Sequence, residues 1–212
     1  MVSTKNYLNY NMEVVEAIKK RRSIRSFRSK PISEKVIKEL IELANLAPTA
    51  SNLKNRRFFV IQDKKTKKKI FKAACRQSQI LETPVVIAVA TDMNLHKEQD
   101  FLKKNEIWGM DLWGATIKNY KDNKKFKSNW KVWKNLWPIQ DADAAITTLL
   151  LAATAKGLAA CWIGTFDAEE TRMILKLPKN LKVVALICLG YQKNTPYPQK
   201  RKPAKELTTW IR

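Results

Sequence analysis

The sequence has 212 residues, of which 45% are hydrophobic, and this length is typical of one domain with a hydrophobic core, so we expect residues 1–212 to form a single domain. Its 41 Lys and Arg residues outnumber 19 Asp and Glu residues, and the resulting net charge of +22 favours an anionic partner such as nucleic acid, an acidic membrane surface or a phosphate-bearing ligand. The hydrophobic content excludes a disordered basic tail, and five glycines and eight prolines exclude a collagen-like chain.

The first half of the chain is predicted to contain helices and strands in alternation. Residues 13–20 should form a helix, because Val14, Val15 and Ile18 fall on one side of it. A second helix is expected to begin at Ser33-Glu34 and to continue at helical spacing until Pro48. Three further predicted elements follow: a short strand at 58–61, a basic helix face at 64–72, and a strand at 84–90 that is buried on both faces.

The segment 96–138 differs in composition, because lysines and asparagines mix with tryptophans. We expect it to be helical, although its hydrophobic periodicity is poor. Four of its tryptophans could stack on a substrate, while packing in the core or on the surface explains each of them more simply: Trp108, Trp113, Trp130 and Trp133.

The last third of the chain begins with a predicted helix at 141–156 that is apolar on most sides and ends at Gly157. Such a helix belongs either in the centre of the core or in a subunit interface. Buried strands are expected at 159–163 and 183–191, with a short helix at 169–175 between them. Because helices and strands alternate without a regular βαβ rhythm, the predicted class is α+β with a mixed sheet.

The cysteines, the histidine and the apolar runs limit the kinds of catalytic site, metal site and cellular compartment that fit the sequence. The longest apolar runs are far too short to span a bilayer, and the N-terminus has none of signal-peptide length. Cys75, Cys161 and Cys188 form no C-x-x-C pair, and the last two are expected to be buried and inert. His96 is the only histidine, so we expect no His-based metal site and no Ser-His-Asp triad. A cytoplasmic protein without a membrane partner fits these features.

A basic cluster directly after the first helix is a candidate anion site. Arg21, Arg22 and Arg25 offer guanidinium groups, which bind phosphate oxygens bidentately, and Ser23 adds a hydroxyl. A solvated basic turn is the simpler alternative. The sequence has neither a Walker lysine loop nor a G-x-G-x-x-G motif, so a bound phosphate would be held by side chains.

Three other segments are candidates for ligand contact. Residues 47–52 form a small-residue loop in which Asn52 offers both a donor and an acceptor, although a helix stop and turn explains the same residues. Residues 157–164 contain a helix stop, a strand and Gly164, whose backbone could face a planar ring, although a loop glycine after a core strand is the alternative. Residues 200–203 are a second basic cluster, for which a solvated tail is the default explanation.

The order and spacing of these segments resemble those of the FMN-dependent nitroreductase family. The resemblance covers residues 14–212 except the variable segment 96–138. It rests on the following motifs: Arg21-Arg22-Ser23-Ile24-Arg25-Ser26-Phe27, Ala47-Pro48-Thr49 with Asn52, Phe58–Ile61, Gln140-Asp141, Gly157-Leu158 with Cys161-Trp162-Ile163-Gly164, Leu175 with Leu177-Pro178, Leu189-Gly190-Tyr191, and the terminal Lys/Arg-Pro cluster.

This resemblance implies a nitroreductase-like α+β fold, with a mixed β-sheet flanked by helices, in an intertwined homodimer with an FMN site at each interface. The helix at 141–156 would then form the dimer core, and 96–138 would be a variable lid. The implied activity is ping-pong hydride transfer from NADH or NADPH, through FMN, to small acceptors such as nitroaromatics or quinones. The chemistry is carried by FMN, so no catalytic side chain is expected.

The resemblance also implies the cofactor-binding residues. Those expected to hold the phosphate and ribityl chain are Arg21, Arg22, Ser23 and Arg25, of which Arg25 would reach the pyrimidine side, together with Arg201 and its neighbour Lys200. Those expected to come from the partner subunit are Pro48, Thr49, Ala50 and Asn52. The segment Trp162, Ile163 and Gly164 would contact the hydride-accepting nitrogen through its backbone.

One departure from the family pattern follows Asn52. The family usually continues with Gln, Pro and Trp, whereas this chain has Lys54, Asn55 and Arg56. A cation at this place could stabilise the reduced flavin or favour an acidic substrate.

Two alternative functions stay open at this point. A nucleic-acid-binding protein would explain the charge, but lysines outnumber arginines by 31 to 10 and are spread along the chain, whereas phosphate-clamping surfaces favour clustered arginines. A related flavoenzyme with other chemistry, such as a reductive dehalogenase or a flavin-fragmenting enzyme, would need substrate residues that the sequence does not identify.

Overall fold

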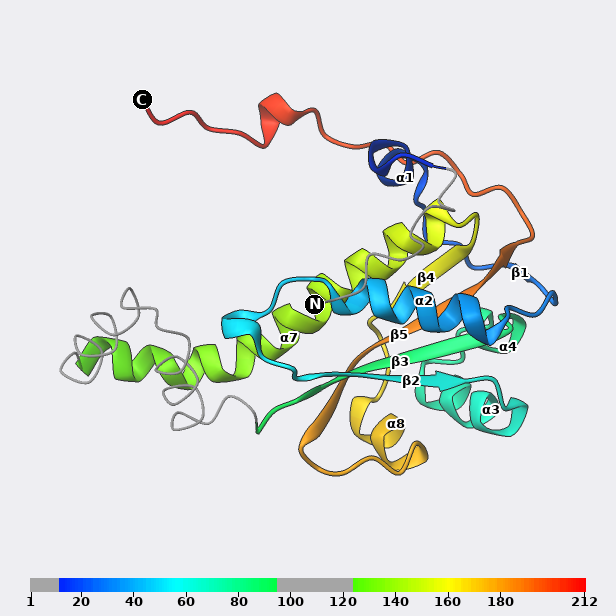
Figure 1. Ribbon diagram of the computed structural model, residues 1–212, viewed down its shortest axis with the longest axis horizontal. Helices are drawn as coiled ribbons and strands as arrows, with labels where there is room; N and C mark the ends of the chain where they lie inside the picture. Colours follow the sequence, from blue (N-terminus) through cyan, green and yellow to red (C-terminus); the bar gives the residue numbers. More distant parts are fainter. Residues whose placement is uncertain (1–11, 95–123) are drawn as a thin grey trace.

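The computed structural model describes residues 12–94 and 124–212, and within these ranges the side chains of all residues except 51, 124–131, 133 and 134. The tryptophans at 108, 113, 130 and 133 and the histidine at 96 therefore lie outside the described side chains. The elements in chain order (Figure 1) are α1 Val14–Lys20, β1 Phe27–Arg28, α2 Glu34–Asn45, η1 Ala50–Asn52, β2 Arg56–Ile61, α3 Lys64–Ala73, α4 Gln79–Glu82, β3 Val85–Asp92, α7 Lys124–Ala155, β4 Ala159–Ile163, α8 Ala168–Ile174, β5 Leu181–Gln192 and η2 Ala204–Glu206.

The sheet is built around β5, which pairs with β3, β4 and β1. Strand β2 completes it beyond β3. The ladders between these strands are antiparallel, and an isolated parallel bridge joins Ser23 to Ala160. This arrangement confirms the expected α+β class.

Helices cover both faces of the sheet, as Figure 1 shows. Val85, Ile87 and Val89 of β3 pack in one core with α2 and α7, whereas the intervening Val86 and Ala88 pack in a second core with α3, α4 and α8. Because side chains alternate along a strand, a strand between two helical layers must be apolar throughout. The burial predicted for this run on both faces is therefore confirmed.

The α2 and α3 helices begin where polar side chains satisfy their first amides. Ser33 Oγ accepts a hydrogen bond from the Val36 N–H at 3.4 Å, and Asp63 Oδ2 accepts one from the Thr66 N–H at 2.7 Å. The predicted start of the second helix at Ser33-Glu34 is confirmed.

The long helix α7 joins two segments that the sequence predicts to be helical. The expected helix at 141–156 is the second half of an element that spans Lys124–Ala155 and contains Pro138, and the helical expectation for 96–138 is confirmed where the structure describes it, from Lys124 onward. Among the described side chains of α7, Val132 and Leu136 are exposed, and buried residues recur at helical spacing from Pro138 to Ala153. Pro138 removes one helical hydrogen bond without ending the helix, and Figure 1 shows that α7 changes direction along its length.

The C-terminal segment leaves the sheet after β5 and runs past α1, as Figure 1 shows. Its residues 201–212 are all exposed, and Leu207, Trp210 and Ile211 are 71%, 78% and 96% exposed. No helix among residues 12–94 and 124–212 has the length and apolar character needed to cross a bilayer.

Candidate functional site

The basic cluster at residues 21–25 lies in an extended segment between α1 and β1. The Ile24 N–H donates a hydrogen bond to the Ala160 carbonyl at 3.0 Å, and Ser23 forms a bridge with Ala160. Ile24 is buried, while its neighbours Ser23 and Arg25 are exposed. The alternation of an extended chain thus places the polar side chains of this segment on the outside of β4.

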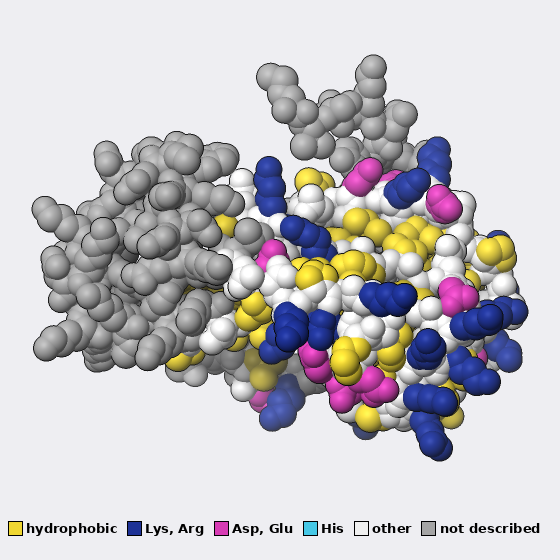
Figure 2. Space-filling view, turned by 90° about the horizontal axis from the view of Figure 1, so that it is seen from below, with side chains coloured by type: hydrophobic (Ala, Val, Ile, Leu, Met, Phe, Trp, Pro, Cys, Tyr) yellow, Lys and Arg dark blue, Asp and Glu magenta, His cyan; other side chains and the backbone are white. Residues whose placement is uncertain are grey.

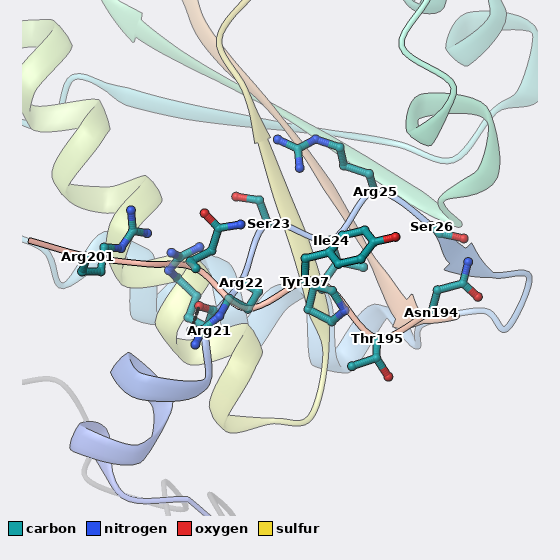
Figure 3. A pocket seen from close by; sticks show the side chains of 12 residues that line it. Arg21, Arg22, Ser23, Ile24, Arg25, Ser26, Asn194, Thr195, Tyr197 and Arg201 are labelled. Atoms are coloured by element: carbon teal, nitrogen blue, oxygen red, sulfur yellow. Dashed lines mark hydrogen bonds between the residues drawn. The ribbon is translucent and has the colours of Figure 1, made fainter.

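These side chains line a cleft of about 430 Å³ that also receives the C-terminal segment. Residues 21–26 form one wall, and the other comes from Asn194, Thr195, Pro196, Tyr197, Gln199 and Arg201. In Figure 3, Arg21, Arg22 and Arg201 lie toward one end, whereas Arg25 extends away from them. The structure therefore brings two predicted basic segments together, although they stand near opposite ends of the chain.

Arg22 lines the cleft and also donates hydrogen bonds to backbone carbonyls. Its Nη1 donates to the Lys19 carbonyl at 2.7 Å and to the Arg21 carbonyl at 2.8 Å, at the C-terminal end of α1. A cation at this end of a helix also interacts favourably with the helix dipole. Because a guanidinium group carries five N–H donors, the other nitrogens of Arg22 can still bind an anion.

Lys200 is exposed and does not line the cleft, in contrast to Arg201. The sequence analysis missed the polar wall residues Asn194, Thr195 and Gln199. These residues stand between a strand end and a basic cluster in no recognisable motif. Only the fold shows that they line the same cleft as Arg21 and Arg22.

The 47–52 loop lies elsewhere in the chain, between α2 and β2, and its residues Pro48, Thr49, Ala50 and Asn52 do not line this cleft. It contains the short helix η1, and Asn52 adopts a positive φ of 52°, which asparagine tolerates better than most residues. Pro48 and Asn52 are exposed, while Thr49 and Ala50 are half-buried. The loop therefore presents its polar edge at the surface of this subunit.

Asp141 of α7 holds this loop from the protein interior. Its Oδ1 accepts a hydrogen bond from the Ala50 N–H, and its Oδ2 accepts one from Asn55 Nδ2, both at 2.8 Å. Burial raises the pKa of Asp141, while the Ala50 amide, the Asn55 side chain and the charge of Arg56 act in the opposite direction. An acidic residue in a largely apolar helix is the sequence signal that could have identified this role.

Arg56 caps α2, so of the two cations at positions 54–56 only Lys54 has no hydrogen bond to a helix end within the described part of the chain. Its Nη2 donates to the Asn45 carbonyl at 3.1 Å and to the Ala47 carbonyl at 2.9 Å. The last carbonyls of a helix have no partners within the helix, and the guanidinium group supplies them. Burial lowers the pKa of Arg56. Of the three residues that replace the usual Gln-Pro-Trp, Asn55 is buried, Arg56 is a cap, and Lys54 is exposed.

The end of β4 presents an accessible backbone. Trp162 is half-buried, Ile163 is buried, and Gly164 is exposed. A Cβ atom on Gly164 would lie 4.0 Å from Trp162 Nε1, so a ligand can approach this backbone closely.

Cys161 and Cys188 are buried, as expected, and stand opposite each other in the β4–β5 register. Burial raises the pKa of both thiols, which disfavours the reactive thiolate.

The positive charge of the chain is dispersed over the face in Figure 2, where Lys and Arg side chains stand apart from one another with acidic side chains among them. The exposed lysines of α3 belong to this distribution: Lys64, Lys65, Lys68, Lys69 and Lys72. This face therefore does not show the continuous basic groove that is typical of a nucleic-acid-binding surface.

Comparison with known proteins gives a consistent result. Residues 18–191 match the family described as "Nitroreductase family". The chain is 30% identical over 201 residues to an "NADH dehydrogenase" of Thermus thermophilus, covering 94% of this chain and 96% of that protein. It is 26% identical to an "FMN reductase [NAD(P)H]" of Bacillus subtilis, covering 90% of this chain and 70% of that protein. A structure from Exiguobacterium sibiricum, solved in complex with FMN, aligns with a TM-score of 0.73 and 24% identity over 94% of this chain and 98% of that one.

Proposed function

Because the chain belongs to the nitroreductase family, we propose that it is an FMN-dependent oxidoreductase that takes hydride from NADH or NADPH and reduces small electron acceptors such as nitroaromatics or quinones. The observation that carries the proposal is the cleft in which Arg21 and Arg22 meet Arg201. The names of relatives, an NADH dehydrogenase and an FMN reductase, support the same class of reaction.

The residues of the cleft fit the phosphate end of FMN. A phosphate carries close to two negative charges and several acceptor oxygens, which guanidinium groups bind bidentately. Arg21, Arg22 and Arg201 supply such donors at one end of the cleft, and the Ser23 hydroxyl lies beside them. Arg25 extends toward another region and is suited to the pyrimidine side of the ring.

Bound FMN supplies the hydride-accepting and electron-transferring chemistry that side chains lack. The chain's own residues would hold the phosphate through Arg21, Arg22 and Arg201, offer the exposed backbone at Gly164 to the ring, and provide positive charge through Arg25. Fixed cations near a site of developing negative charge favour its formation without reorganisation. On this proposal, the cofactor ligands are the residues predicted from the family resemblance, except Lys200, which does not line the cleft.

We also propose that the active form is a homodimer. Val14, Val15 and Ile18 of α1 are each more than half exposed, and the apolar Leu207, Trp210 and Ile211 project from the C-terminal segment. Apolar side chains at such exposure are stabilised when a partner covers them. The 47–52 loop does not line the cleft of its own subunit, which supports the expectation that it contributes to the site of the partner.

The experiment is a spectrum of the purified protein combined with its mass in solution. The proposal expects a dimer that carries bound flavin, absorbs near the visible maximum of oxidised flavin, and is bleached anaerobically by NADH or NADPH. A panel of nitroaromatics, quinones, enones and halogenated aromatics then restores the absorption and ranks the acceptors. A protein that refuses added FMN, yet binds DNA with a steep salt dependence, would contradict the proposal.

A further inference from the structure

Asp141 stands where α7 enters the hydrophobic core, and its contacts reach across the fold to the 47–52 loop. Both carboxylate oxygens accept hydrogen bonds, one from the Ala50 amide and one from the Asn55 side chain. The exposed fraction is 5% for Asp141 and 0% for Asn55. A carboxylate removed from water to this degree is destabilised unless protein donors replace its hydration. The two N–H groups fixed on the loop and on its C-terminal flank provide that replacement.

The backbone hydrogen bonds within the turn of the loop are long. Within the turn, the Asn52 N–H donates to the Thr49 carbonyl at 3.3 Å and the Leu53 N–H donates to the Ala50 carbonyl at 3.2 Å, both near the long end of the normal range. The 2.8 Å bond from the Ala50 amide to Asp141 is shorter and charge-assisted. The conformation of the backbone at Ala50 therefore depends strongly on Asp141.

We propose that Asp141 is a positioning residue for the flavin: it fixes the 47–52 loop in the conformation that contacts the cofactor of the partner subunit. This inference rests on the proposed function, because the loop has a cofactor to contact only if the protein binds FMN. Asn55 contributes to the same positioning, because its side chain donates the hydrogen bond that holds the other carboxylate oxygen of Asp141. A residue buried in the core of one subunit thereby fixes a loop that contacts the FMN bound in the site of the other subunit.

An exchange of the two side chains tests the proposal. Asn55→Asp places a second carboxylate beside that of Asp141 at a buried position. The repulsion between the two should weaken FMN binding about tenfold. In the double variant Asn55→Asp/Asp141→Asn, the amide at position 141 accepts from the Ala50 N–H and donates to the carboxylate at position 55. Both hydrogen bonds are thus restored, and the FMN affinity should return to within about threefold of wild type.

Asp143→Asn is the matched control. Asp143 lies on the same helix, and no hydrogen bond of its side chain occurs among the described residues, so FMN affinity should stay within about twofold of wild type. The measurements are FMN titration by fluorescence and the visible circular dichroism of the bound flavin. A purely structural role of Asp141 would change the melting temperature and leave the circular dichroism of the bound flavin unchanged.

The possible results separate the two proposals. Wild-type protein that takes up no FMN contradicts the proposed function. If the wild-type protein binds FMN, two results would contradict the role of Asp141 alone. One is that Asn55→Asp binds FMN as tightly as the wild type, and the other is that the double variant binds FMN no more tightly than Asn55→Asp. If Asn55→Asp does not fold, Asn55→Ala replaces it, because this variant removes the donor to Asp141 without adding a buried charge; unchanged affinity and flavin circular dichroism would then overturn the inference.

Discussion

Arg201 lines the same cleft as Arg21, so the fold joins a residue near the end of the chain to one near its beginning. The first is carried by an exposed segment after β5, and the second by the extended stretch after α1. The proposed anion site takes donors from both segments. It is therefore complete only once the C-terminal segment lies beside the N-terminal one.

This relationship predicts that the two arginines act on the same ligand group. Arg21→Ala and Arg201→Ala should each weaken FMN binding by about tenfold or more, because each removes charge-assisted hydrogen bonds to the phosphate. Riboflavin, which lacks the phosphate, should bind both variants and the wild type alike. Fluorescence titration measures all of these affinities.

The control for this prediction is Lys202→Ala, which removes an exposed cation next to Arg201 that does not line the cleft. Its FMN affinity should stay within about twofold of wild type at physiological salt. An equal loss in Lys202→Ala and Arg201→Ala would mean that general positive charge, rather than contact, attracts the cofactor.

Replacement of Arg56 should lower stability. Arg56→Ala leaves the carbonyls of Asn45 and Ala47 without their guanidinium partner, so the free energy of unfolding should fall by about 1–2 kcal/mol. Arg57→Ala removes an exposed guanidinium group and should change it by less than about 0.5 kcal/mol. Urea denaturation of both variants checks the difference, and equal values would remove the capping role.

The raised pKa of Asp141 predicts a pH dependence of opposite sign to that of a salt-bridged carboxylate. The folded protein binds the proton of this residue more tightly than the unfolded chain, so the contribution of Asp141 to stability is greatest below its ordinary pKa of 3.8 and decreases as pH rises through the folded value. Relative to Asp141→Asn, the wild type should therefore lose stability as pH rises above 3.8.

Urea denaturation of these two proteins at a series of acidic pH values measures that difference. The other carboxylates titrate in both proteins and cancel to first order. A difference that is constant with pH, or that grows in favour of the wild type, would contradict the direction of the shift.

Two glycines should respond differently to the same substitution. A Cβ on Gly190 would lie 2.8 Å from Phe27 Cδ1 and 2.9 Å from Pro84 Cδ, so Gly190→Ala should cost about 1–3 kcal/mol through overpacking. Gly164→Ala meets open space and should leave the free energy of unfolding nearly unchanged. On the proposed function it should weaken FMN binding, because the added methyl group stands where the ring approaches. Thermal denaturation and FMN titration separate the two effects.

The sequence predicts the elements whose cause is local. The apolar run of β3 and the Ser33 start of α2 follow from alternation and capping, which involve neighbours in the chain. The continuity of α7 across Pro138 could not be predicted in this way, because proline usually ends or kinks a helix. The family resemblance identifies the arginines of the cleft as a group, but their meeting with Asn194 and Gln199 depends on the course of the chain after β5.

The contacts of the 47–52 loop could not be predicted from the sequence for a related reason. Asp141 and Asn55 are 86 positions apart, and although an acidic residue in a largely apolar helix indicates a buried partner, neither segment identifies the other. The capping of α2 by Arg56 was not predicted either, because it depends on the end of α2 lying within reach of the guanidinium group.

The hydrogen bond from Ile24 to Ala160 has one more consequence, since β4 runs on from Ala160 to Ile163 and Gly164 directly follows it. The segment with Arg21, Arg22 and Arg25 is attached near the start of this strand, and the exposed glycine follows its end. A strand advances about 3.3 Å per residue, so β4 separates Ala160 from Gly164 by roughly 13 Å. An insertion or deletion of one residue in β4 would change this separation and turn the intervening side chains to the opposite face. On the proposed function, such a change should weaken FMN binding, because the phosphate contacts and the ring contact would no longer match the length of the cofactor.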